Sequence, residues 1–227
     1  MNQLEIVQLN FKNNKKTIKQ YLKCIERSCN ILQLEIPPVY FIYQDKTYFF
    51  LFDQNLNYIS SDYRDVGKNI GFMKFIRKEY VIYVNYCAFA DPTLIIIKAY
   101  ELVRHIYQLK MISYFDMINT NIKAGQTSEN DEDIRKLENS STYQKLESNI
   151  RSWKYCYQNK NKNKVSNELN SKGNKNVSLI EADMMAFSYL MMKKYHRINI
   201  DYKIENKKDF LKSVDFVNET IFNFISY

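Results

Sequence analysis

An apolar helix with two ionisable side chains at its centre constrains the fold of this chain most. Asp91 and Pro92 begin this helix, because an aspartate caps the first helical amides and proline fits the first helical position. The helix is expected over residues 92–115, and its first half is buried because residues 94–97 are all apolar. Glu101 and His105 follow in its middle. A buried carboxylate and imidazole are unfavourable unless they are paired, hydrogen-bonded or bound to metal, so the fold has to supply partners for both.

The order of the other patterns is typical of an α+β fold. An amphipathic helix over residues 14–34 ends before Pro37 and Pro38, since proline does not continue a helix. Runs of aromatic and β-branched residues then predict short strands at residues 39–43, 47–52, 58–59 and 80–86. Further helices are expected at residues 133–157, 178–195 and 206–227. This order predicts a small, mainly antiparallel sheet packed against helices.

The length of 227 residues suits a single domain over residues 1–227. Residues 119–178 are rich in asparagine, lysine, serine and acidic residues, and we expect them to form a polar insertion. Within it, residues 160–176 are low in complexity and are expected to be mobile. The chain then ends in the amphipathic helix over residues 206–227.

Composition argues against several kinds of site. Only four glycines are present, and none of them forms a glycine-rich phosphate loop. The four cysteines include no C-x-x-C pair, which excludes a zinc ribbon, and we expect reduced, mostly buried thiols. The first residues carry no signal peptide, and the apolar run at residues 94–97 is far shorter than a membrane span. A cytoplasmic protein with no membrane partner is therefore expected.

Three short segments share one order and one register. Val81-Ile82-Tyr83-Val84-Asn85 precedes the central helix, Arg104-His105-Ile106-Tyr107-Gln108 lies in it, and Glu181-Ala182-Asp183 with Ala186-Phe187 lies in a later helix. In this order they resemble small zincin-like metallopeptidases of the ImmA/IrrE type and related peptidases of Gram-positive bacteria and their mobile elements. The resemblance covers about residues 14–115 and 178–195, and it implies a minimal zincin-like fold around an active-site-type helix.

The resemblance also implies where a metal site would lie. Many of these peptidases carry H-E-x-R-H-x-Y-Q, in which two histidines one turn apart bind the metal and the glutamate is the general base. Glu101 stands at the first histidine position and His105 at the second. The later helix supplies the third ligand; Asp183 matches that position best, and its neighbour Glu181 could replace it. The flanking positions of the motif match Arg104, Tyr107 and Gln108.

Two consequences follow from these replacements. A set of Glu101, His105 and Asp183 is more anionic than a two-histidine site and would suit Mn²⁺ or Fe²⁺ as well as Zn²⁺. Hydrolysis is the harder case, because Leu102 stands at the base position and cannot take a proton from metal-bound water. The loss of a well-placed base lowers a rate by about 10² to 10⁴. Tyr100, Asp183 or Glu181 would have to compensate.

Two other interpretations of the same segment stay open. In a second register Tyr100 and Glu101 replace the His-Glu pair, which keeps Glu101 as a base but puts Arg104, a cation, at a metal-ligand position. In a metal-free interpretation, Glu101, His105 and Arg104 form a salt-bridged cluster with an acidic residue of the E-x-D segment, Glu181 or Asp183, and no cofactor is needed.

These interpretations lead to three hypotheses of function. The first is a catalytically degenerate pseudo-peptidase that binds another macromolecule, with a protein as its partner and a phage or other mobile element as its source. The second is an active, metal-dependent peptidase with an atypical Glu/His/Asp site. The third is a nucleic-acid-binding protein, since the net charge is +8 and aromatic residues lie among basic ones at Lys154, Tyr155 and Tyr157.

Overall fold

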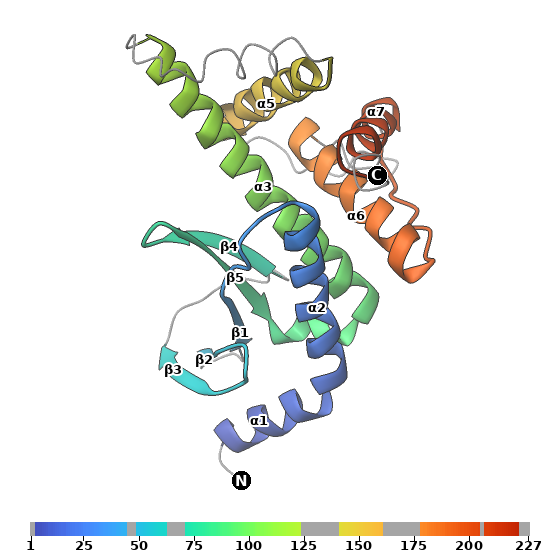
Figure 1. The fold of residues 1–227 in the computed structure, drawn as a ribbon. Coiled ribbons are helices and arrows are strands. Elements are labelled where there is room, and N and C mark those ends of the chain that lie inside the picture. Colours follow the sequence, from blue (N-terminus) through green and yellow to red (C-terminus); the bar gives the residue numbers. More distant parts are fainter. Residues whose placement is uncertain are drawn as a thin grey trace. The chain divides into compact units, whose positions relative to one another are not determined.

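The computed structural model describes residues 3–44, 49–62, 71–123, 141–160, 178–204 and 207–222 (Figure 1). The chain folds into two compact units, Met1–Val103 and Arg104–Tyr227, which meet in sequence within one long helix. The α+β class is confirmed: a five-stranded sheet, antiparallel in all but one of its pairings, accompanies six α-helices in the described residues. The expectation of a single domain over residues 1–227 stays a prediction.

The first unit opens with two helices and continues into the sheet. The helices are α1 (Gln3–Asn13) and α2 (Lys15–Ile31), and the strands are β1 (Val39–Gln44), β2 (Phe49–Phe52), β3 (Tyr58–Asp62), β4 (Gly71–Ile76) and β5 (Glu79–Asn85). The strand order is β3-β2-β1-β5-β4, and the pairing of β1 with β5 is parallel. A 3₁₀ turn, η1 (Tyr86–Ala90), then leads to the long helix α3 (Pro92–Lys123).

Two elements of the first unit were not predicted. Helix α1 lies in a stretch that the sequence analysis left without structure, and β4 forms a hairpin with β5. The hairpin turns at Arg77 and Lys78, whose φ angles are 50° and 72°. Tight hairpin turns with two positive φ angles usually contain Asn or Gly. Neither residue stands here, so the usual sequence signal for the turn is missing.

One face of the sheet is covered by helices. Phe41 of β1 lies beside Val84 of β5, which in turn lies beside Gly71 of β4, so the three share a face. On this face the Phe41 ring lies 6.5 Å from that of Tyr21 on α2, centre to centre. A Cβ added at Gly71 would lie 3.3 Å from Cδ1 of Leu102, so α3 approaches β4 closely there. Helix α2 and the first half of α3 therefore cover the same side of the sheet (Figure 1).

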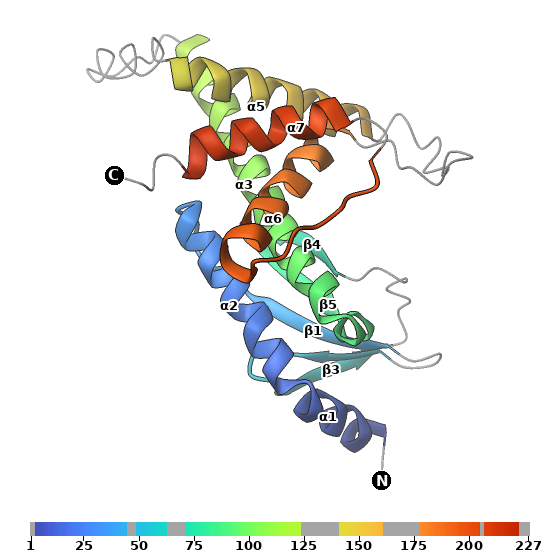
Figure 2. The same ribbon diagram turned by 90° about the vertical axis from the view of Figure 1, so that its right-hand side faces the viewer.

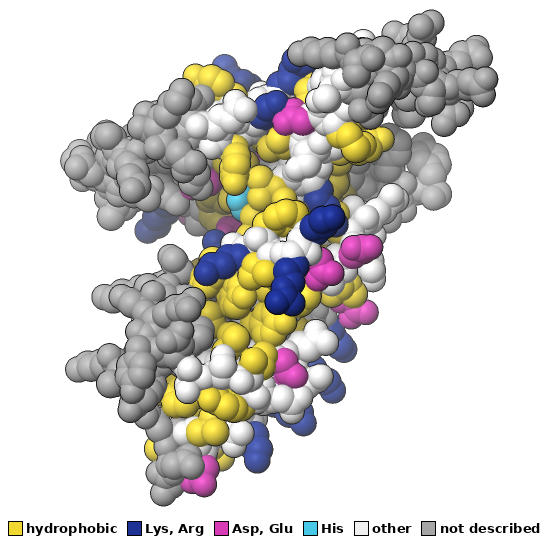
Figure 3. Space-filling model, turned by 90° about the vertical axis from the view of Figure 1, so that its left-hand side faces the viewer, with side chains coloured by type: hydrophobic (Ala, Val, Ile, Leu, Met, Phe, Trp, Pro, Cys, Tyr) yellow, Lys and Arg dark blue, Asp and Glu magenta, His cyan; other side chains and the backbone are white. Residues whose placement is uncertain are grey.

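The other face of the sheet carries a row of aromatic rings. Tyr40 and Tyr83 stack with their centroids 5.6 Å apart, and Phe72 stacks on the other side of Tyr83 at 5.2 Å. The ammonium group of Lys74 lies 5.6 Å from the centre of the Phe72 ring. Figure 3 shows one side of the molecule, on which hydrophobic side chains lie with basic ones among them. The ring stack joins three neighbouring strands, β1, β5 and β4, and so stiffens this part of the sheet.

The described part of the second unit consists of helices and a non-helical stretch over residues 197–204 (Figure 2). It contains the second half of α3, α5 (Ser141–Lys160), α6 (Leu179–His196), α7 (Lys207–Val217) and a π-helical turn, η2 (Asn218–Phe222). The predicted helices at 133–157, 178–195 and 206–227 are confirmed within the described residues. Helix α6 begins with a capping box: Ser178 Oγ accepts from the Glu181 amide, and the Glu181 carboxylate accepts from the Ser178 amide.

Parts of the predicted polar insertion belong to helices. Residues 119–123 end α3 and residues 141–160 form α5, in which Trp153 is buried. The segment predicted to be mobile, residues 160–176, lies outside the described residues except for its first position. Cys24, Cys29 and Cys156 are reduced thiols outside any disulfide, as expected, and the first two are buried. Of the helices described here, none combines the length and the apolar character needed to cross a membrane.

Replacing Phe41 by alanine should lower the free energy of unfolding by about 3–5 kcal/mol, because it leaves a cavity in a fully buried part of the first unit. Phe75→Ala is the matched control: this ring is 63% exposed, and its loss should change the free energy of unfolding by less than about 1 kcal/mol. Urea denaturation followed by circular dichroism measures both. Equal effects of the two variants would contradict the described core.

Candidate functional site

A buried ion pair joins two helices of the second unit. Arg104 on α3 donates from Nε to Oδ2 of Asp183 on α6 at 2.7 Å, and from Nη2 to Oδ1 at 2.9 Å. The two side chains are only 1% and 2% exposed. Two parallel N–H···O bonds are the strongest arrangement that an arginine and a carboxylate can adopt. The carboxylate of Asp183 is therefore neutralised by a cation that belongs to the chain itself.

Gln108, one turn after Arg104 on α3, completes the polar cluster. Its Nε2 donates to Oδ2 of Asp183 at 2.6 Å and to the backbone oxygen of Ile180 at 3.1 Å. Its Oε1 lies 3.2 Å from Nδ1 of His105. The spacing of four residues places Arg104 and Gln108 on one face of α3, so both reach the start of α6. Asp183 thus accepts three N–H bonds.

Aromatic rings enclose the guanidinium group of Arg104. Its central carbon lies 4.7 Å from the ring centre of Tyr107, 5.4 Å from that of Trp153 and 5.7 Å from that of Phe187. Among the described residues, Nη1 of Arg104 finds no hydrogen-bond partner. Ring faces carry partial negative charge and attract such a cation. The aromatic rings and the carboxylate of Asp183 together hold this charge away from water.

The other predicted metal ligands are engaged elsewhere. Glu101 is half-buried, and its Oε2 lies 3.3 Å from Nζ of Lys98 in the first unit. Glu181 caps the start of α6, where it accepts from the amide and the hydroxyl of Ser178. In the part of the chain that the structure describes, no group of three or more His, Cys, Asp and Glu residues is placed to hold a metal ion.

The predicted metal ligands are not arranged to bind a metal in this structure. Asp183 would have to give up hydrogen bonds to Arg104 and Gln108 before its oxygens could coordinate a metal. Arg104 would then be left as a buried cation without its carboxylate, which is strongly unfavourable. Metal binding at Glu101, His105, Asp183 or Glu181 stays a prediction. The metal-free alternative included an ion pair of Arg104 with Asp183 or Glu181, and the structure forms it with Asp183.

Neither Leu102 at the base position nor the nearby tyrosines, Tyr100 and Tyr107, readily provide an anion that could act as a base. Leu102 is buried in the first unit, in contact range of β4 at Gly71. Burial raises the pKa of the Tyr100 hydroxyl, which also hydrogen-bonds to Cys24. Burial likewise raises the pKa of Tyr107. Both phenols are therefore protonated at neutral pH, and neither can act there as a phenolate base.

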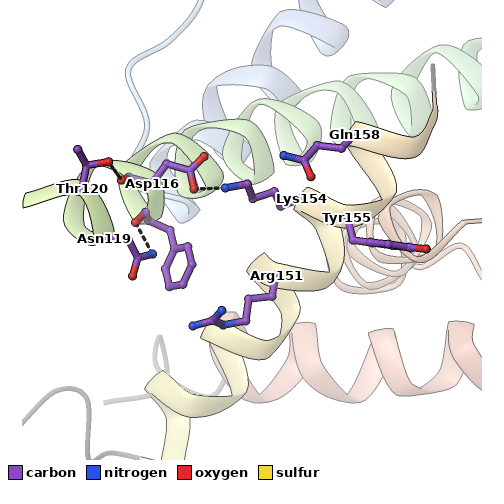
Figure 4. Close-up of a pocket in the computed structure, with 8 residues that line it drawn as sticks. Asp116, Asn119, Thr120, Arg151, Lys154, Tyr155 and Gln158 are labelled. Carbon is purple, nitrogen blue, oxygen red and sulfur yellow. Dashed lines mark hydrogen bonds and ion pairs between the residues drawn. The ribbon is translucent and has the colours of Figure 1, made fainter. Parts of the chain in front are cut away.

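A second site lies between the end of α3 and α5 (Figure 4). It is an open groove of about 780 Å³, and its walls include Lys154 and Tyr155, which the sequence analysis singled out. Tyr157 is exposed but does not line it. The sequence analysis missed the wall from α3, since it predicted that this helix ends at residue 115. The spacing of apolar residues by three or four positions at Ile112, Phe115, Ile118 and Ile122 was the available signal for a longer helix.

Comparisons of the chain with models of known protein families, with curated proteins and with solved structures find no match.

Asp183→Asn should lower the free energy of unfolding by about 3–5 kcal/mol, because it leaves a buried guanidinium group without a counter-charge. The double variant Arg104→Met/Asp183→Leu should be considerably more stable than the sum of its two single changes predicts. Urea denaturation of the wild type, Arg104→Met, Asp183→Leu and the double variant forms the cycle, and Asp183→Asn is measured beside them.

Glu147→Gln serves as the control for this cycle. It breaks the pair of Glu147 with Arg151, whose side chains are 30% and 64% exposed, and should change stability by less than about 1 kcal/mol. Additive effects of the Arg104 and Asp183 changes would show that the two side chains do not depend on each other.

Proposed function

We propose that this chain is a catalytically degenerate, zincin-like protein that acts by binding another macromolecule, with a protein as its partner. The observation that carries the proposal is the saturated carboxylate of Asp183, which accepts three N–H bonds from Arg104 and Gln108. The resemblance to zincin-like peptidases assigns this carboxylate to the third metal ligand. In this chain an arginine supplies the positive charge that a metal would supply.

The position of Leu102 supports the same proposal. A general base has to reach a metal-bound water, and a leucine has no group that accepts a proton. Leu102 is also part of the packed interior of the first unit, beside β4. A glutamate at this position would place a carboxylate in an apolar contact, which is unfavourable. The packing around Leu102 is therefore suited to an apolar residue and opposes a return of the base.

An active peptidase would require a different arrangement of the same residues. Asp183 would have to exchange its bonds to Arg104 for a metal, and Glu101 would have to leave Lys98. No described contact favours that exchange. A scaffold that holds its charges in internal pairs is better suited to recognition by its surface than to chemistry at this cluster.

Elemental analysis of the full chain, purified without a histidine tag and dialysed against Zn²⁺, Mn²⁺ and Fe²⁺ in turn, tests the proposal. We expect well below one metal ion per chain, because Asp183 is already neutralised. We also expect a chelator to leave the thermal unfolding midpoint unchanged. About one tightly bound metal per chain, together with a lower unfolding midpoint after chelation, would refute the metal-free assignment.

Glu101→Gln and His105→Gln are the matched variants for this test, since neither changes the buried pair of Arg104 and Asp183. Any metal bound by the predicted ligands should be lost in both variants. If the wild-type chain binds metal and both variants still bind it, the metal lies elsewhere and the proposal for this cluster stands. If both variants lose the metal, the predicted ligands bind it and the proposal fails.

A further inference from the structure

One side of helix α2, in the first unit, carries a cluster of four lysines. Lys15, Lys16, Lys19 and Lys23 are all exposed, and each lies three or four residues from another. With 3.6 residues per turn, this spacing brings all four within an arc of about 100° around the helix axis. We call these four residues the lysine face of α2.

The other side of α2 is buried in the first unit and fixes the direction of the lysine face. Its buried residues include Ile18, Tyr21 and Ile25. The ring of Tyr21 lies 6.5 Å from that of Phe41 and 6.4 Å from that of Phe89, centre to centre. Helix α2 lies over one face of the sheet (Figure 1). Because this packing holds one side of the helix inward, the lysine face is held toward solvent.

The charges of the lysine face are not neutralised by the described part of the chain. None of its four ammonium groups forms an ion pair there. Exposed cations of other helices have carboxylate partners, for example in the pairs of Lys98 with Glu101 and of Arg151 with Glu147. Glu26 lies further along α2 and is exposed, but it is not in a described ion pair either. Four positive charges and one negative charge therefore face solvent on this helix.

Folding alone does not account for this arrangement. Like charges three or four residues apart on a helix repel each other. The lysine face contains three such neighbours, because Lys19 lies four residues after Lys15, three after Lys16 and four before Lys23. The first turn of α2 contains no acidic residue that would offset them. A bound anion would remove this repulsion, so the face is better suited to a ligand than to the chain alone.

The composition of the exposed side of α2 favours phosphate groups as the ligand. Lysine binds phosphate as a compact point charge with rotatable donors. The other exposed residues of α2 are Gln20, Glu26 and Asn30, so none is aromatic or apolar. Unpaired bases would find no ring on which to stack. A protein partner or a membrane would find no apolar group to bury, as the centre of an interface or an inserted helix requires.

The length of the lysine face suits the charge density of a duplex. Eight residues separate Lys15 from Lys23, which corresponds to about 12 Å along the helix axis. A nucleic-acid duplex carries one phosphate per about 1.7 Å of its axis, so about seven phosphates lie along the same length. One strand alone carries half of this charge. Four lysines can therefore each approach a phosphate of a duplex that lies along α2.

We infer that the lysine face of α2 binds the phosphate backbone of a nucleic-acid duplex without reading its sequence. Sequence is read by side chains that reach base edges, whereas contacts to phosphates carry no sequence information directly. The inference goes beyond the proposed function and does not rest on it, because it involves neither the pair of Arg104 and Asp183 nor a protein partner.

Fluorescence anisotropy of a fluorescein-labelled DNA duplex of mixed sequence tests the inference on the full chain. The logarithm of the affinity should fall linearly with the logarithm of the salt concentration, by about 0.9 for each phosphate contact and about 3.6 for four lysines. A duplex of unrelated sequence should compete as well as the probe sequence. Single-stranded DNA, polyglutamate and vesicles that contain phosphatidylserine are the other competitors, and each should compete less well at equal anionic charge.

Paired variants separate the lysine face from the rest of the basic surface. Lys16→Gln/Lys23→Gln should lower the salt slope by about 1.8 and weaken binding at low salt by roughly tenfold or more, because two phosphate contacts are lost. Lys207→Gln/Lys208→Gln is the matched control: it removes two exposed charges, outside any described ion pair, from the first turn of α7. It should leave the affinity nearly unchanged. Lys16→Arg/Lys23→Arg keeps the charges and should keep the affinity.

Three results would overturn the inference. The first is no binding of the duplex at low salt. The second is an equal loss of affinity in the α2 and α7 glutamine variants, which would leave only a general attraction to basic surface. The third is competition by single strands, polyglutamate or vesicles that equals competition by the duplex; the last two would assign the face to an acidic protein or to a membrane surface. Circular dichroism of each variant confirms that its helices are retained.

Discussion

The second unit depends on one interaction, the two-fold hydrogen-bonded ion pair of Arg104 and Asp183. Burying two opposite charges is favourable only when their geometry is good and the remaining donors are satisfied. Here Gln108 gives the carboxylate a third N–H bond, and aromatic rings surround the guanidinium group, whose Nη1 has no hydrogen-bond partner among the described residues. The pair therefore joins the second half of α3 to α6.

Neighbouring residues within a single turn of α3 have different surroundings. Leu102 belongs to the apolar interior beneath the sheet, whereas Arg104 belongs to the polar cluster of the second unit. Glu101, in the first unit, is partly exposed and pairs with Lys98. A sequence with apolar and charged residues alternating along a helix can therefore have a simple physical explanation. Each side chain is matched to the element that faces it.

Local chemistry made much of the fold predictable. The cap at Asp91, the capping box at Ser178 and the aromatic pattern of β5 each describe contacts between residues that are close in sequence. Strand β4 was missed because its turn lacks Asn and Gly, and its positive φ angles are set by the hairpin as a whole. The choice of Asp183 over Glu181 as partner of Arg104 could not be predicted either, because 79 residues separate the pair and spacing along α6 alone does not determine which acid faces α3. The groove between α3 and α5 could not be predicted for the same reason, because its two walls come from segments that are distant in sequence.

The position of Trp153 has a practical consequence. It is the only tryptophan of the chain, it is almost fully buried, and it lies against the guanidinium group of Arg104. The first unit contains no tryptophan and is rich in tyrosine. Excitation of indole alone therefore follows the loosening of the second unit, whereas tyrosine absorbance follows both units, since ten of the 19 tyrosines lie in the first and nine in the second. The chain thus carries its own optical label for the second unit, without any added dye.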